Sequence, residues 1–161
     1  MILKDSLLKE LREYFGVDTK RINHAEKVLY FAEILLEHEP ADRDIVVPAS
    51  ILHDVGIKVA EEKYGSAAGH YQEKEGPEIA RSLLLKTGLD KKKIDEICHI
   101  IGHHHSPGKI NTHNFMVLYD ADWLVNLKDE VGIADKDKLK QLISKTFLTS
   151  TGKLMAEKFY L

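Results

Sequence analysis

The chain has 161 residues, 43% of them hydrophobic and 30% charged, and its net charge is −3. This length and composition are typical of one globular domain, and a nearly neutral chain has no electrostatic footprint for duplex nucleic acid or an anionic membrane. The single cysteine, Cys98, excludes an intrachain disulfide. The first residues have no apolar signal-peptide core, and no segment approaches 18 apolar residues. We therefore expect a cytoplasmic protein without a transmembrane helix.

The apolar residues follow a helical period along nearly the whole chain. The stripe from Ile22 to Leu36 is the clearest, with apolar side chains at i, i+3, i+4 and i+7. Gly16 and Gly88 are typical helix stops. No strand-like alternation persists, so we predict an all-α fold, an irregular bundle of about eight helices. The expected helical segments are residues 3–15, 18–37, 42–56, 59–64, 75–86, 90–105, 115–128, 135–145 and 149–160.

Two polar groups occur within this apolar pattern in the first half of the chain. His53 and Asp54 directly follow the small apolar run 49–52, at the end of a helix that we expect to be buried. Burying an imidazole beside a carboxylate is costly unless something binds them, and a divalent metal can bind both. His24 lies on the apolar stripe of its own helix. Taken singly, the dipeptide could be a solvated helix end and His24 a core histidine.

Asp120 and Asp122 lie inside the most apolar helix of the chain, and both require compensation for burial. Asp122 and Asn126 are four residues apart and share a helix face. A metal bound by Asp122, with Asn126 orienting the carboxylate, would satisfy both side chains. Asp120 is the rival ligand, or a supporting residue next to the metal. The alternative for Asp120 is a buried salt bridge or a hydrogen bond to a helix terminus.

The order His, His-Asp, Asp on three helices resembles the HD-domain superfamily of metal-dependent phosphohydrolases. The matching text is NHAEKV from residue 23, SILHDVG from residue 50 and ADWLVN from residue 121, and the resemblance spans about residues 20–130. It implies a single HD-type domain over residues 1–161, in which residues 135–161 add C-terminal helices. It also implies His24, His53, Asp54 and Asp122 as metal ligands. This nitrogen and oxygen set suits Mn, Fe, Co, Ni or Mg better than a structural zinc.

The resemblance suggests further roles near these ligands. Many members recruit more histidines, so His103 or His104 is expected as a second-metal ligand or a phosphate contact. His103 is favoured because it shares a helix face with His99, and His105 is expected to be silent. An exposed histidine cluster at a helix C-terminus is the alternative. Gln72 stands where another histidine is usual, so we expect one metal ion, with two as the alternative.

Lys58 follows the His-Asp pair closely and is expected to bind a substrate phosphate. The predicted function is hydrolysis of a phosphate ester in a small molecule, a nucleotide or related metabolite, by a metal-activated water. The alternative is a non-catalytic HD module that binds a nucleotide or a partner and keeps its metal for structure or sensing. Oxidative cleavage at a di-iron centre is a third option, and it needs a full dinuclear ligand set. The oligomeric state is left open, a homodimer being one option.

Overall fold

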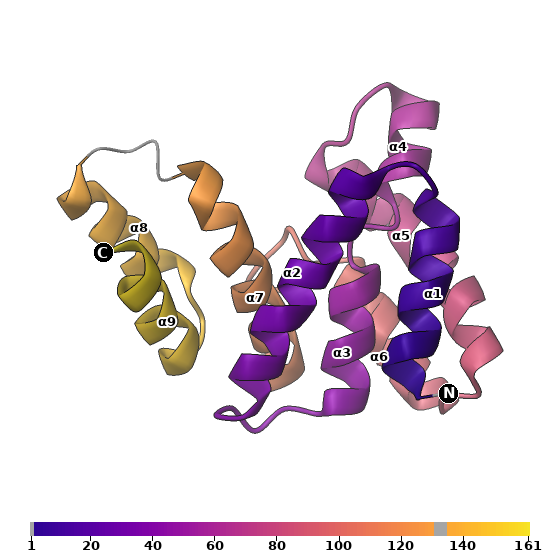
Figure 1. Ribbon diagram of the computed structural model, residues 1–161, viewed down its shortest axis with the longest axis horizontal. Coiled ribbons are helices and arrows are strands. Elements are labelled where there is room, and N and C mark those ends of the chain that lie inside the picture. Colours follow the sequence, from indigo (N-terminus) through magenta and orange to yellow (C-terminus); the bar gives the residue numbers. More distant parts are fainter. Residues whose placement is uncertain (1, 131–134) are drawn as a thin grey trace.

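A computed structural model describes residues 2–130 and 135–161 (Figure 1). These residues form nine α-helices and one short 3-10 turn, and the described part of the chain contains no strand, which confirms the predicted all-α fold. None of the described helices is long and apolar enough to cross a membrane. The helices are α1 (Leu3–Phe15), α2 (Thr19–Leu36), α3 (Arg43–Leu52), α4 (Ile57–Tyr64), α5 (Gly69–Leu84), α6 (Lys91–Ile101), α7 (His113–Glu130), α8 (Lys136–Thr146) and α9 (Ser150–Tyr160), with the 3-10 turn η1 (Leu85–Thr87) after α5.

The centre of the bundle is formed by α2, α3 and α7. Helix α2 packs against both α3 and α7, and α3 also packs against α6 and α7 (Figure 1). The stripe predicted on α2 is the buried one, and it meets an α3 whose apolar residues are all buried. Helix α7 has apolar residues around its circumference because α2 and α3 cover one side and α9 covers another. Polar side chains on α2, α3 and α7 are therefore brought into close proximity.

Three helix boundaries differ from the sequence prediction by four residues or more. Helix α3 ends at Leu52 rather than near Gly56, α6 ends at Ile101 rather than near residue 105, and α5 begins at Gly69 rather than near residue 75. Gly56 allows the turn after α3 to touch α5, since a Cβ there would lie 2.6 Å from the Gln72 carbonyl oxygen. The His-Asp pair and the histidine run therefore lie in turns after helices, not on helices.

The C-terminal helices α8 and α9 lie beside α7, away from α1 and α4 (Figure 1). Asp120 of α7 anchors them: Oδ1 accepts from the Leu148 amide at 2.9 Å, and Oδ2 accepts from the Thr149 amide at 2.8 Å and the Thr149 hydroxyl at 2.7 Å. Burial raises the pKa of Asp120 to about 6 despite these three donors. The Asp120 carboxylate therefore binds the start of α9 and is not among the grouped ligand atoms of His24, His53 and Asp122. This matches the alternative of a hydrogen bond to a helix terminus.

Candidate metal centre

Four of the predicted residues converge between α2, α3 and α7. The Nε2 atom of His24 lies 3.2 Å from His53 Nε2, 3.1 Å from Asp122 Oδ1 and 3.3 Å from Asp54 Oδ2. His53 Nε2 in turn lies 3.4 Å from each of the same two carboxylate oxygens. Two imidazoles and two carboxylates thus direct one atom each at a common point. This donor set suits a divalent transition metal or Mg²⁺.

Neighbouring groups fix the orientation of two of these side chains. His53 is fully buried, and its Nδ1 lies 2.8 Å from the Ser50 carbonyl oxygen. Because a carbonyl can only accept, Nδ1 carries the proton and Nε2 is presented to the cluster. Asn126 donates from Nδ2 to Asp122 Oδ1 at 3.1 Å, one helical turn away on α7. The structure thus brings Asn126 next to Asp122, where the sequence prediction put it.

Burial and charge contacts shift the pKa values of the cluster residues in opposite directions. Burial alone would lower the pKa of His53, but the carboxylates of Asp54 and Asp122 outweigh it and hold that pKa well above the usual range. Burial alone would raise the pKa of each carboxyl, but contact with His53 holds both well below their usual range. The two carboxylates therefore hold a proton tightly on the His53 ring. A divalent cation could replace that proton as the counter-charge.

Asp54 also faces a second group of ligand atoms through its other oxygen. His104 Nε2 lies 3.3 Å from Asp54 Oδ1. His104 is 1% exposed, and its Nδ1 is 2.7 Å from the Ile101 carbonyl oxygen, which leaves Nε2 as the available atom. Among the described residues, Nε2 of His104 is the one buried side-chain nitrogen or oxygen without a hydrogen-bond partner. A buried nitrogen left unpartnered beside a carboxylate fits a metal ligand or a proton acceptor.

His103, which the sequence favoured over His104, points elsewhere. Its Nδ1 lies 2.8 Å from the His99 carbonyl oxygen, and its ring packs at 4.7 Å from the His99 ring. The prediction assumed that α6 continues to residue 105, so that positions 99 and 103 share an inward face. Because α6 ends at Ile101, the chain turns at residues 102–105 and brings His104 inward instead.

His105, expected to be silent, also lies at the site. Its ring is grouped with Asp54 and His104, with ligand atoms all within 4.8 Å of one another. His105 Nε2 is 2.9 Å from Gln72 Oε1, and desolvation of the ring, together with nearby His104, lowers the pKa of His105 to about 4. Glu73 holds this turn by accepting from the His105 amide at 3.2 Å and the Ser106 hydroxyl at 3.0 Å. No spacing rule pointed to His105, because its position depends on the end of α6.

Comparison with known proteins agrees with this arrangement. The HD-domain family model matches residues 21–127, a span that includes His24, His53, Asp54, His104 and Asp122. The chain belongs to the HD-domain family. HD domains bind divalent metals and are generally metal-dependent hydrolases. No curated protein and no solved structure matches the chain.

The HD-domain cluster opens onto a groove. The cationic side chains that line this groove are not the lysine that the sequence predicted. Lys58, expected to bind phosphate, is exposed, and its Nζ lies 5.3 Å above the centre of the Tyr14 ring. It does not line the groove. Lys20 and Arg21 of α2 do so, and Arg21 is paired with Glu61 at 2.8 Å. Sequence analysis missed Lys20, although a lysine four residues before His24 on a helix must share its face.

Proposed function

We propose that this HD-domain protein hydrolyses a phosphate ester in a small molecule, a nucleotide or related metabolite. The observation that carries the proposal is the convergence of His24, His53, Asp54 and Asp122. Five pairs of their ligand atoms lie 3.1–3.4 Å apart. These residues would hold a divalent ion. When bound, such an ion lowers the pKa of water and polarises a phosphoryl oxygen.

Asp54 has the central position in this proposal. One of its oxygens faces His24 and His53, and the other faces His104. The carboxylate can therefore serve the first ligand group and still orient a water molecule on the His104 side. His53 and Asp122, locked by Ser50 and Asn126, keep the ligand atoms in place without rearrangement.

His104 is the proposed proton-transfer residue. Because Nδ1 donates its proton to the Ile101 carbonyl, Nε2 is the ring nitrogen that is available for proton transfer. That atom can accept a proton from the attacking water and later return it to the leaving group. A second metal ion bound by Asp54, His104 and His105 is the alternative use of the same atoms.

A metal analysis combined with a phosphoester panel tests the proposal. We expect about one divalent ion per chain and turnover of at least one phosphate ester that requires the metal. Asp54→Asn should lose at least about 100-fold in rate, while Asp5→Asn, an exposed position on α1, should retain full activity.

The non-catalytic HD module gives a different result in the same experiment. It would retain the metal and bind a nucleotide without turning over any member of the panel. Absence of turnover by metal-loaded, folded protein would therefore favour that alternative over hydrolysis.

A further inference from the structure

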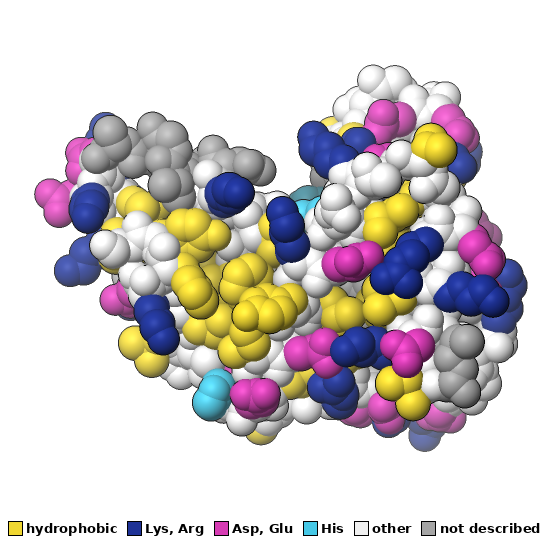
Figure 2. All heavy atoms as spheres, in the orientation of Figure 1, with side chains coloured by type: hydrophobic (Ala, Val, Ile, Leu, Met, Phe, Trp, Pro, Cys, Tyr) yellow, Lys and Arg dark blue, Asp and Glu magenta, His cyan; other side chains and the backbone are white. Residues whose placement is uncertain are grey.

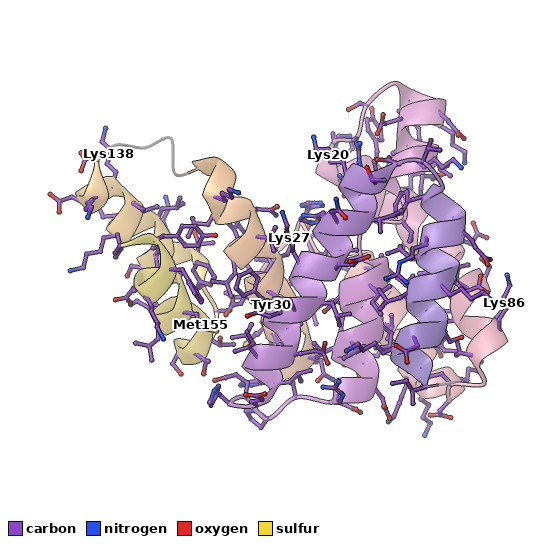
Figure 3. The ribbon with its side chains drawn as sticks, viewed as in Figure 1. Lys20, Lys27, Tyr30, Lys86, Lys138 and Met155 are labelled. Atoms are coloured by element: carbon purple, nitrogen blue, oxygen red, sulfur yellow. The ribbon has the colours of Figure 1, made fainter. Side chains whose placement is uncertain are left out.

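The groove at the cluster extends further along α2 and α7. Its continuation is lined by Lys20, Asn23, His24 and Lys27 of α2 and by Asn126 and Lys128 of α7. Figure 3 shows Lys20 and Lys27 on α2, with Lys27 lying on the side of α2 that faces α7. Figure 2 shows Lys and Arg side chains around the hollow in this region, with a histidine visible at its base. We call Lys20, Lys27, Lys128 and the surface between them the lysine groove.

The two lysines of α2 are spaced on either side of His24. Positions 20, 24 and 27 follow the i, i+4, i+7 pattern and therefore form one stripe on the helix. At about 1.5 Å per residue, this stripe extends roughly 10 Å, with His24 between its ends. Lys128 approaches the same groove from α7, two residues after Asn126. A ligand seated at His24 is thus near a positive charge in either direction along the groove.

These three charges have no counter-charge within the described part of the protein. No described carboxylate pairs with Lys20, Lys27 or Lys128. Other lysines of the chain are paired, for example Lys4 with Glu33 at 3.0 Å and Lys93 with Asp44 at 2.9 Å. Three ammonium groups that pair with no described carboxylate lie around one groove, and they raise the local concentration of anions there.

We propose that the lysine groove binds a second phosphoryl group of the substrate. The substrate class would then be molecules with two or more phosphates, such as nucleoside di- or triphosphates or bisphosphates, rather than simple monoesters. This inference rests on the proposed function, because it places the reacting phosphate at the His-Asp cluster. A phosphoryl group carries more charge than a single carboxylate and matches three ammonium groups better.

Binding of non-hydrolysable anions tests the inference without requiring turnover. Methylphosphonate, methylenediphosphonate and phosphonoacetate are titrated by calorimetry into protein loaded with one equivalent of Mn²⁺. Wild-type protein is compared with Lys20→Met, Lys27→Met and Lys128→Met, and with Lys9→Met, an exposed lysine on α1, as the control. The Mn²⁺ affinity of each variant is measured as well, so that metal lost to the chelating diphosphonate is distinguished from weaker anion binding.

We expect each groove variant to bind methylenediphosphonate about 3- to 10-fold more weakly and methylphosphonate less than 2-fold more weakly, with Lys9→Met unchanged. Equal losses for both ligands, or no loss, would overturn the inference. Equally tight binding of phosphonoacetate by wild-type protein would overturn the assignment to phosphate.

The panel of phosphoesters separates this inference from the proposed function. Selective diphosphonate binding without turnover of any ester would support the lysine groove and reject hydrolysis. Turnover of monoesters without preference for a second phosphate, and without an effect of the lysine variants, would support hydrolysis and reject the groove.

Discussion

His104 Nε2 lies 3.3 Å from Asp54 Oδ1 and has no hydrogen-bond partner among the described residues. Asp54 is thereby placed between two sets of imidazoles, with His24 and His53 on its other oxygen. A buried nitrogen without a hydrogen bond is destabilising unless a neighbouring charge or a bound ion compensates it. The protein retains it beside the cluster, which distinguishes His104 from the two histidines that flank it in sequence.

His104→Ala is therefore expected to lower kcat/KM by ~10²–10⁴-fold, the usual contribution of a general acid or base. His103→Ala should change it less than about threefold, since the His103 ring packs on His99. Steady-state kinetics on the best ester of the panel measure both values. A larger loss in His103→Ala than in His104→Ala would contradict the assignment.

The metal count of the same variants distinguishes the two roles of His104. A wild-type content of one ion that persists in His104→Ala supports proton transfer. A content of two that falls to one in His104→Ala identifies a second metal site at Asp54, His104 and His105.

Removal of the metal should lower the melting temperature. The four ligands come from α2, α7 and the turn after α3, so one ion cross-links three segments that are distant in sequence. Saturation at about 100 times the dissociation constant stabilises a fold by about 2.7 kcal/mol, roughly 5–10 °C for a chain of this size. Thermal unfolding after chelation and after addition of Mn²⁺ measures the change. An identical melting curve, with no metal found by elemental analysis, would reject the site.

Metal affinity should increase with pH. The carboxylates of Asp54 and Asp122 hold the pKa of His53 well above its usual range, so in the metal-free protein a proton occupies the cluster at neutral pH. Because a metal needs the neutral ring, binding must release that proton, and affinity falls by up to about tenfold for each unit that pH drops below the His53 pKa. Calorimetry at pH 6, 7 and 8, in buffers with different ionisation enthalpies, counts the protons released. Binding without proton release would contradict this expectation.

Asp120→Ala is expected to destabilise the fold without loss of metal. The substitution leaves the amides of Leu148 and Thr149 without their acceptor at the start of α9, at a cost of about 2–4 kcal/mol. Urea unfolding gives the free-energy change, and elemental analysis of the folded variant gives the metal content. Loss of metal from folded Asp120→Ala would show instead that this carboxylate serves the cluster.

The pH dependence of the same carboxyl has a definite sign. Burial raises the pKa of Asp120 to about 6 from an ordinary value near 4, so the folded protein holds a proton that the unfolded chain releases in between. The resulting stabilisation is complete below about pH 4 and is lost as pH rises through about 6. Wild-type protein should therefore gain stability relative to Asp120→Asn when pH falls from 7 to 4.5. A constant difference between the two proteins would contradict the raised pKa.

The residues that the sequence could predict were those whose signal is local. His24 and Asp122 stand on apolar helix faces, and the His-Asp pair ends a buried run, so the cost of burial pointed to all of them. The resemblance to HD domains then linked residues that lie far apart in the chain. The all-α class followed from the helical period alone.

The residues that the sequence misplaced depend on where helices stop. Whether His103 or His104 faces inward is decided by the end of α6 at Ile101. Gly102 caps this end, but the sequence prediction continued the helix past it. Lys58 lies in the first turn of α4, and its ammonium group lies over the Tyr14 ring of α1, a contact that no local pattern predicts. The partners of Asp120 lie 28 and 29 residues further along the chain, beyond the range of any periodic signal.

The hydrogen bonds of Asp120 join α7 to the start of α9, so a chain cut between these helices would lose them. The family match ends at residue 127, but the donors that satisfy Asp120 come from residues 148 and 149. A chain shortened to the matched span would retain all four cluster residues and would leave a carboxylate in an uncovered apolar helix. We therefore expect the matched span alone to be less stable than the full chain. A relative that keeps the four ligands but lacks the last two helices is expected to have an apolar residue in place of Asp120.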